Sequence, residues 1–262
     1  MALPIYQIDA FTQKRFGGNP AAVVPLQSWL SDEQMLNIAA ENNLAETAFI
    51  VPAKTGADFE LKWFTPEVEI DLCGHATLAA AFTLFEHLNF VGEQVSFSTR
   101  SGILKVAKDG DALTMDFPTR APEDKPLPVD ILDALGLKSV RYSGLSRDWL
   151  IVLDNEQAVA NLEFECSELA KATNTAVIVT AKGDHCDFVS RFFAPHFGVD
   201  EDPVTGSAHC TLIPYWAGVL DKTELKARQI SRRGGDLHCR LEQERVFITG
   251  HAVTYLVGAI EI

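Results

Sequence analysis

The stretch of this chain with the clearest chemical character is Glu201–His209, which reads Glu-Asp-Pro-Val-Thr-Gly-Ser-Ala-His. Two acidic residues come first, a turn containing Pro and Gly follows, and small residues then open an apolar segment that we expect to be a helix. The first backbone N–H groups of a helix have no partner inside it and carry a partial positive charge. The stretch therefore predicts a corner where an anion can bind without a basic side chain.

The first half of the chain contains a degenerate copy of this stretch. Phe64-Thr65-Pro66 and the later Cys73–Thr77 parallel Phe193-Ala194-Pro195 and the later Thr205–His209. Each copy reads as a strand, Phe-x-Pro, an acidic loop and Gly-x-Ala at the start of an apolar helix. We infer a duplicated domain, in which a curved, mostly β unit surrounds one buried helix twice. Two helix N-termini at a shared cleft would then hold one anion between them.

Glu46 is the single charge in Leu44–Val51, a segment whose β-branched and aromatic residues predict a strand. Neither face of that strand is polar. Its carboxyl group is therefore either exposed to solvent near a strand end or partly buried and functional. Its position alone favours the exposed alternative, because most glutamates lie at the surface.

Composition narrows the class of protein. The chain has 262 residues, of which 47% are hydrophobic and 22% charged, as in an ordinary globular protein. Its formal net charge of −14 argues against nucleic acid or an anionic membrane as a partner, although a local site can still bind an anion. Five widely spaced cysteines without a Cys-x-x-Cys pair favour reduced thiols over disulfides or a zinc site. With neither a signal-peptide pattern nor a membrane-length apolar run, we expect a cytoplasmic protein.

The best candidate for a linker is Pro118–Pro128, which is rich in proline and charge. We therefore expect an N-terminal half over residues 1–118 and a C-terminal half over residues 129–262, in which the last strand could cross back to the first half. Arg232 and Arg233 lie in a basic turn, where they could bind a carboxylate, although such turns more often lie at a surface or dimer contact.

Six segments together resemble the PhzF family, the phenazine-biosynthesis isomerase group within the diaminopimelate-epimerase fold. They are Asn19-Pro20, Leu44–Phe49, Phe64–Pro66, Cys73–Thr77, Glu201–His209 and Ser231–Gly235. The resemblance implies an α+β fold of two similar β-barrel-like halves, each wrapped around a central buried helix, with the active site in the cleft between them. It also implies a homodimer, and catalysis without a metal or an organic cofactor.

The phenazine enzyme of this family shifts a proton within a dihydro-hydroxyanthranilate ring system. Its catalytic glutamate matches Glu46, and its supporting residues match His75, Asp202 and Ser207. The resemblance therefore implies a cofactor-independent isomerase that moves a proton on a small carboxylate-bearing substrate, with Glu46 as the general acid and base. Because His75 lies at the positive end of a helix, we expect its neutral form.

The helix starts supply the remaining candidate residues. Their backbone N–H groups would hold a substrate carboxylate or a developing enolate. The predicted substrate-binding residues are Cys73, Gly74, Ala76, Thr205, Gly206 and Ala208. Asp202 either orients His75 or a substrate amine, or caps the second helix, and Ser207 either donates to a substrate oxygen or simply begins that helix. Cys73 is either a thiol whose pKa is lowered by the helix N-terminus or a small residue packed in the cleft.

One departure bears on the reaction. The epimerase and racemase relatives of the fold use a pair of thiols, one at the start of each central helix. Here the first position is Cys73 and the second is Thr205, whose hydroxyl is far too weak an acid to match a thiol. A two-thiol racemase is therefore disfavoured. Two alternatives stay open, namely a racemase or epimerase of amino or hydroxy acids and a non-catalytic small-molecule-binding protein on the same fold.

Overall fold

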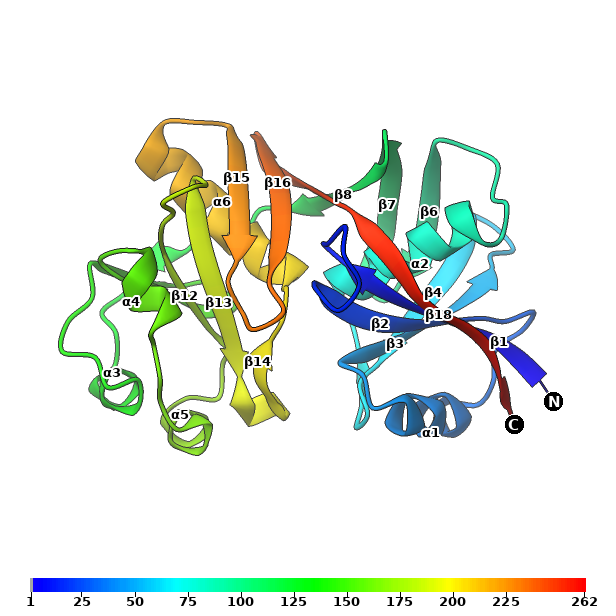
Figure 1. Cartoon of the computed structure of the whole chain (residues 1–262), viewed down its shortest axis with the longest axis horizontal. Coiled ribbons are helices and arrows are strands. Elements are labelled where there is room, and N and C mark those ends of the chain that lie inside the picture. Colours follow the sequence, from blue (N-terminus) through cyan, green and yellow to red (C-terminus); the bar gives the residue numbers. More distant parts are fainter. Residues whose placement is uncertain (1) are drawn as a thin grey trace. The chain divides into compact units, whose positions relative to one another are not determined.

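The computed structural model describes residues 2–262 and divides into two compact units (Figure 1). Unit 1 comprises the residues up to Asp116 together with Thr249–Ile262, and unit 2 comprises Phe117–Ile248. Both units combine mixed sheets with few helices, which confirms the predicted α+β class. No described helix is long and apolar enough to cross a membrane.

Unit 1 is built on one curved mixed sheet. Its elements are β1 (Ala2–Ala10), β2 (Asn19–Pro25), α1 (Asp32–Asn42), β3 (Glu46–Pro52), β4 (Phe59–Phe64), β5 (Glu69–Ile70), α2 (Gly74–Glu86), β6 (Gln94–Thr99), β7 (Gly102–Asp109), β8 (Ala112–Pro118) and β18 (Ala252–Glu261). The strands follow the order β18-β1-β2-β3-β4-β6-β7-β8, and β2–β3 and β4–β6 are the parallel pairs. The sheet is not closed into a barrel, because none of the ladders described joins β18 to β8.

The sheet of unit 1 carries a helix on each face. α2 contacts β18 at one edge of the sheet and β7, the strand next to the other edge, and 11 of its 13 residues are buried. A helix this apolar on all sides requires such complete enclosure. On the other face, Met35 and Ile38 of α1 pack with Phe49 and Val51 of β3 in a second apolar cluster. Side chains alternate along a strand, so Glu46 lies on the face of β3 opposite to Phe49, the face toward α2.

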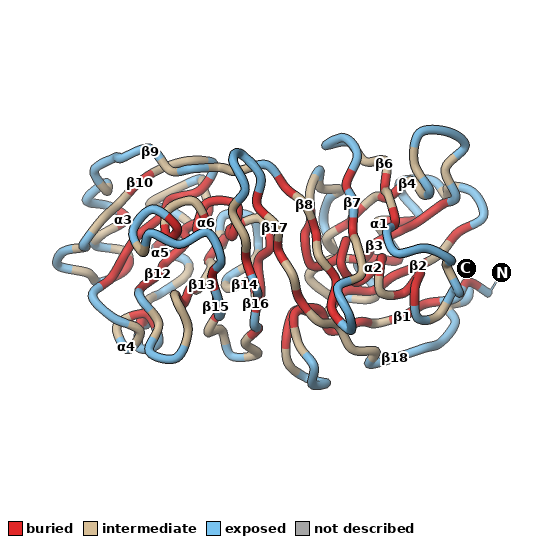
Figure 2. Tube along the Cα trace, turned by 90° about the horizontal axis from the view of Figure 1, so that it is seen from above, coloured by how far each residue is buried: buried red, intermediate tan, exposed pale blue. Residues whose placement is uncertain are grey.

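Unit 2 repeats this plan. Its elements are β9 (Glu123–Asp124), α3 (Val129–Ala134), β10 (Tyr142–Leu145), β11 (Trp149–Val152), α4 (Glu156–Ala160), α5 (Cys166–Ala172), β12 (Val177–Lys182), β13 (Phe188–Ala194), the 3₁₀ turn η1 (Pro195–Phe197), β14 (Val199–Asp202), α6 (Gly206–Leu220), β15 (Glu224–Gln229), β16 (Gly235–Glu242) and β17 (Arg245–Gly250). The strand order is β9-β10-β11-β12-β13-β15-β16, and β11–β12 and β13–β15 are parallel. In each unit the buried segments lie along the strands and the central helix, and many of the connecting loops are exposed (Figure 2).

The internal repeat is visible in the strand registers. Thr47 pairs with Phe64 in unit 1, and Val177 pairs with Phe193 in unit 2. The registers also match in the parallel pairs β4–β6 and β13–β15. Phe59 pairs with Phe97 and Phe188 with Ala227, and Phe59 and Phe188 each lie five residues before the phenylalanine just named in their strand. Counting along these registers places Ala176 where unit 1 has Glu46, and Gln229 where unit 1 has Thr99. The duplication therefore preserves the backbone plan while changing the polar side chains.

The segment predicted as a linker, Pro118–Pro128, is bonded into unit 2. Thr119 N donates to Glu244 O and Arg120 N to Cys210 O, and β9 pairs with β10. The last strand, β18, pairs along its length with β1, so both ends of the chain belong to unit 1 (Figure 1).

Candidate active site

Glu46 and His75 meet at the start of α2 in unit 1. Glu46 is the first residue of β3, and His75 is the second residue of α2. Glu46 Oε2 lies 3.0 Å from His75 Nε2, and the two side chains are 14% and 4% exposed. Neither of these two buried atoms makes a hydrogen bond of good geometry among the described residues. The carboxyl group is therefore largely buried beside an imidazole, yet not locked to it, and it keeps a narrow opening to solvent.

Asn19 holds the other ring nitrogen of His75. The Asn19 Nδ2 atom lies 3.0 Å from His75 Nδ1, and the Asn19 side chain is fully buried. In this orientation the amide donates to Nδ1, which leaves the ring proton on Nε2, facing Glu46. When both ring nitrogens carry protons, the amide can turn by half a rotation and present its oxygen instead. Asn19 can thus support either protonation state of His75.

The turn before Asn19 depends on a glycine. Gly18 has a φ of +63°, in the left-handed region, and a Cβ there would collide with the carbonyl oxygen of Ala10. Only glycine meets both conditions. Sequence reasoning included Asn19 in a family segment but missed this contact with His75, and the Gly-Gly-Asn-Pro run was the available signal.

Cys73 is the N-cap residue of α2, and its Sγ lies 3.5 Å from His75 Nδ1. Burial, followed by the charge of Glu46, raises the pKa of the thiol to about 11. The predicted lowering of this pKa by the helix N-terminus is therefore wrong, because desolvation outweighs the helix dipole. The thiol keeps its proton at neutral pH, which agrees with the alternative of a small residue packed in the site.

The charge of His75 also differs from the prediction. Burial by itself lowers the pKa of the imidazole, but the acidic groups of Cys73 and Glu46 outweigh it and hold the pKa well above its ordinary value. Since the thiol of Cys73 is protonated at neutral pH, the Glu46 carboxylate is the charge that favours the imidazolium. The expectation of a neutral His75 considered only the helix end and not a carboxylate 3.0 Å away.

These three side chains form a compact acid–base cluster. One ligand atom from each of Glu46, Cys73 and His75 lies within 4.8 Å of the others, which is close enough for them to surround a metal ion. Carboxylate, thiolate and imidazole are zinc ligands, but a thiol with a pKa of about 11 must first give up its proton. Binding of a metal ion by this cluster would therefore release the proton of Cys73.

In unit 2 the equivalent helix start is lined by hydroxyl and amide groups. Thr205 is the N-cap residue of α6, and its hydroxyl donates to Asp202 Oδ2. Gln229 accepts from Thr205 N at 2.9 Å and donates to Asp202 O at 2.7 Å. Ser207 is the second residue of α6 and half-buried, between the buried Gly206 and Ala208. Asp202 is itself buried, at 8% exposure, three residues before the helix cap.

His209 supports this helix start from inside. Its Nδ1 lies 2.8 Å from the carbonyl oxygen of Thr205, and burial lowers the pKa of its imidazole to about 4. The side chain is therefore neutral and donates from Nδ1. In unit 1 the hydroxyl of Thr77 bonds to the carbonyl oxygen of Cys73 in the same way. Sequence reasoning missed the roles of both His209 and Gln229.

The two units therefore differ in chemistry. His75 and Cys73 correspond to Ser207 and Thr205, and Glu46 corresponds to Ala176, which has no functional side chain. Gly74 and Ala76 lie in the buried first turn of α2, as Gly206 and Ala208 do in α6. Unit 1 thus carries an adjacent carboxyl, thiol and imidazole, and unit 2 carries hydroxyl and amide groups around the Asp202 carboxyl.

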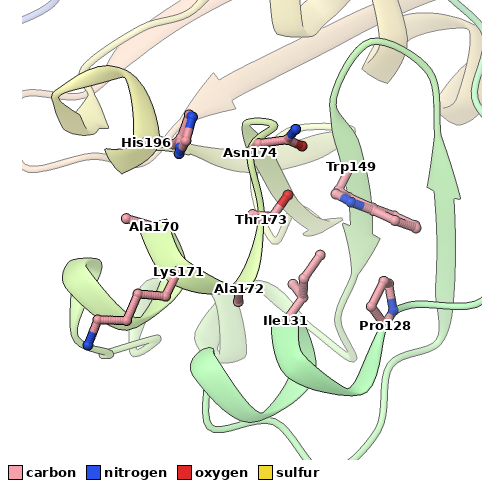
Figure 3. A pocket seen from close by; sticks show the side chains of 9 residues that line it. All are labelled: Pro128, Ile131, Trp149, Ala170, Lys171, Ala172, Thr173, Asn174 and His196. Carbon is pink, nitrogen blue, oxygen red and sulfur yellow. The ribbon is translucent and has the colours of Figure 1, made fainter.

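Two candidate residues, Arg232 and Arg233, follow β15 in the sequence. Arg232 is exposed and Arg233 half-buried, on the turn between β15 and β16. A pocket of about 360 Å³ on unit 2 contains none of the predicted residues (Figure 3). It is lined by Pro128, Ile131, Trp149, Ala170, Lys171, Ala172, Thr173, Asn174 and His196. An apolar groove of about 610 Å³ on unit 1, around Leu26 and Phe90, contains none of them either.

Comparison with known proteins decides the family. Residues 8–258 match the family model described as phenazine biosynthesis-like protein. The chain belongs to the PhzF family. An uncharacterized isomerase of Pseudomonas aeruginosa is 51% identical over 262 residues, which cover all of both chains. A crystal structure of a PhzF-family phenazine biosynthesis protein from Enterococcus faecalis is 46% identical, with a TM-score of 0.95 and full coverage of both chains.

A solved structure of much lower sequence identity shows the fold alone. A hydroxyproline epimerase from Agrobacterium vitis has a TM-score of 0.67 at 11% identity, covering 99% of this chain and 92% of the epimerase. This likeness agrees with the diaminopimelate-epimerase type of architecture implied by the sequence.

Proposed function

We propose that this PhzF-family protein is a cofactor-independent isomerase that moves a proton on a small carboxylate-bearing substrate, with Glu46 as the general acid and base. The observation that carries the proposal is the 3.0 Å approach of Glu46 Oε2 to His75 Nε2 in a largely buried cluster. A carboxylate held beside a protonated imidazole, without a fixed hydrogen bond, can accept a proton and return it. The isomerase name of the relative from Pseudomonas aeruginosa supports the same reaction class.

In the proposed reaction the Glu46 carboxylate takes a proton from one substrate carbon. The electron pair of the broken C–H bond spreads into the conjugated system of the substrate. The protonated carboxyl group then returns the proton to another carbon, so the substrate is neither oxidised nor reduced. His75 donates from Nε2 toward Glu46, and N–H groups at Gly74–Ala76 stabilise the developing negative charge.

Unit 2 contributes substrate binding in this proposal. The N–H groups at Gly206–Ala208 and the hydroxyl of Ser207 bind the substrate carboxylate, because the start of α6 offers donors and a partial positive charge. Asp202 binds a substrate amine. The support is the arrangement at the start of α6, where Asp202 and Thr205 are held by Gln229.

The test uses a dihydro-hydroxyanthranilate, the substrate type implied by the family resemblance, in deuterated water. Solvent deuterium should enter the ring with the wild-type protein, and Glu46→Gln should lower the rate about 10²- to 10⁴-fold. Glu67→Gln, at an exposed position, removes the same charge as a control. Unchanged turnover in folded Glu46→Gln refutes the proposal, and binding without deuterium uptake by the wild type favours a non-catalytic binding protein. Inversion at a single carbon, tested with paired enantiomers, identifies a racemase or epimerase instead.

We further propose that the protein is a homodimer formed through β18. Its residues Tyr255–Ala259 are all exposed, and no charged residue occurs between Ala252 and Ile260 in a chain of net charge −14. Natural edge strands that stay unpaired usually carry charges or proline. Antiparallel pairing of two copies about Val257 sets Tyr255 opposite Ala259 and Leu256 opposite Gly258, so that large side chains face small ones.

Light scattering after size-exclusion chromatography tests this interface. Val257→Lys should convert the dimer into a monomer, since Val257 is 60% exposed and lies on the proposed two-fold axis. Val68→Lys, at a comparably exposed valine away from β18, should leave the dimer intact. A wild-type monomer, or a dimer that survives Val257→Lys, contradicts the proposal. The proposed location remains the cytoplasm, which agrees with the five cysteines being free.

A further inference from the structure

Two side chains at the end of β15, those of Gln229 and Ser231, form hydrogen bonds with the loop before α6. Ser231 Oγ donates to the carbonyl oxygen of Pro203 at 2.7 Å. Gln229 reaches the same loop on both sides of Pro203, at the carbonyl oxygen of Asp202 and at the amide of Thr205. This loop joins Asp202 to the first N–H groups of α6. Whatever sets its conformation therefore also sets the direction of those groups.

Among the described residues, unit 1 repeats the hydrogen bond of the serine but not those of the glutamine. Ser101 Oγ donates to the carbonyl oxygen of Asp71 at 2.8 Å. Ser101 and Ser231 lie two residues beyond the equivalent strand positions Thr99 and Gln229, and Asp71 and Pro203 lie two residues before their helix caps. The serine contact is thus a property of the repeat. The Thr99 hydroxyl bonds to Gly102 O within its own turn, so the glutamine contact belongs to unit 2.

Gln229 is placed to control direction and not only packing. Its side chain is fully buried, and its amide oxygen accepts from Thr205 N at 2.9 Å. Its amide nitrogen donates to Asp202 O at 2.7 Å and to Thr205 Oγ1 at 3.2 Å. Because a hydroxyl has one proton, Thr205 Oγ1 accepts from Gln229 and donates to Asp202 Oδ2. The chain of bonds from Gln229 through Thr205 therefore fixes the direction in which the Asp202 carboxylate points.

We infer that Gln229 is a positioning residue, which orients the Asp202 carboxylate and the Thr205 peptide for substrate binding at the start of α6. The inference rests on the proposed function. A buried glutamine that only filled space could be replaced by leucine, which is similar in size, without any effect on substrate affinity. A glutamine that positions these groups cannot be replaced in that way, because three polar partners lose their bonds at once.

The test compares the wild type with Gln229→Leu and with Thr99→Val, the matched change at the equivalent position of unit 1. Hydrogen exchange followed by NMR reports on the Thr205 amide, and deuterium uptake by the dihydro-hydroxyanthranilate gives kcat and KM. For Gln229→Leu we expect Thr205 to exchange about tenfold faster or more, and KM to rise about tenfold with little change in kcat. Thr99→Val should change neither the exchange rate of the Thr205 amide nor KM.

Gln229→Glu supplies a second variant that keeps the shape of the side chain and adds a pH readout. Its ionised carboxyl can accept from Thr205 N but cannot donate to Asp202 O. Its KM relative to the wild type should therefore be raised at about pH 8 and recover toward about pH 5, as the introduced carboxyl takes up a proton. A purely structural role predicts no such recovery.

The outcomes separate the inference from the proposed function. If the wild type takes up no deuterium, the proposed function fails and the inference falls with it. If the wild type is active while Gln229→Leu and Gln229→Glu keep its KM at every pH, only the inference is overturned. An unchanged exchange rate of the Thr205 amide in Gln229→Leu also overturns it.

Discussion

The contact between Asn19 and His75 offers a quantitative test of how the acid–base cluster is held. Asn19 is fully buried and His75 is 3% exposed, with 3.0 Å between Nδ2 and Nδ1. Asn19→Leu keeps the volume but removes the amide partner of His75 Nδ1 and leaves that buried nitrogen the longer contact with the Cys73 thiol at 3.5 Å. Leaving a buried polar group unpaired costs about 1–3 kcal/mol. For a chain of this length that corresponds to a fall in melting temperature of about 2–4 °C per kcal/mol.

Urea unfolding of four proteins isolates this pair from the other contacts of Asn19. The set consists of the wild type, Asn19→Leu, His75→Leu and the double variant. Contacts of Asn19 that do not involve His75 contribute equally to both sides of the cycle and cancel. We expect a coupling energy of about 1 kcal/mol or more and a loss of deuterium-transfer activity in Asn19→Leu, since the imidazole is no longer oriented. A coupling energy below about 0.3 kcal/mol would refute the reasoning, because independent sites add to within that error.

Three further predictions follow from charge and burial. Because the pKa of Cys73 is about 11, its alkylation by iodoacetamide should accelerate about tenfold per pH unit through the neutral range, and fast labelling that does not change with pH contradicts this. His75 has a raised pKa in the folded state, so its proton stabilises the fold below the pKa of an unfolded histidine, and that contribution is lost as pH rises through the folded pKa. The free energy of unfolding of the wild type relative to His75→Gln should therefore decrease above about pH 6.5, and a constant difference disproves the linkage. Arg191 donates two hydrogen bonds of 2.7 and 3.0 Å to the Glu201 carboxylate and also donates to two backbone carbonyls. Arg191→Lys should therefore lower the free energy of unfolding by about 1–3 kcal/mol. A change below about 0.5 kcal/mol would show that these hydrogen bonds do not stabilise the fold.

The duplication of the domain could be predicted from the sequence because the same local sequence pattern occurs in both halves of the chain. Strand, proline, acidic loop and an apolar helix recur in order around Cys73–Thr77 and Thr205–His209, and the strand registers of the two units match. The burial of most residues of α2 and α6 also follows from their apolar composition. The sequence specified less well whether the sheet closes, because strand pairing at the edges depends on long-range contacts. The halves were expected to be barrel-like, and the sheet of unit 1 is open.

The charges in the site could not be predicted from local rules. The helix-end argument gave the wrong direction for the pKa of Cys73 and the wrong charge for His75, because complete burial and the approach of Glu46 outweigh the helix dipole. Glu46 itself remained ambiguous in the sequence, since a strand end can face either solvent or a neighbouring helix. Gln229 reaches Thr205 across 24 residues of sequence, and Asn19 reaches His75 across 56, so a local pattern can mark the turn before Asn19 but cannot name the partner of either side chain.

Label transfer within a single substrate molecule tests the central claim most directly. A dihydro-hydroxyanthranilate carrying deuterium at the carbon that loses its proton is converted in ordinary water under single-turnover conditions, and the product is analysed by mass spectrometry and NMR. If the largely buried Glu46 carries the proton from one carbon to the other, a measurable share of the deuterium must reappear at the receiving carbon. A product without deuterium at that carbon, formed at the full wild-type rate, would contradict the account.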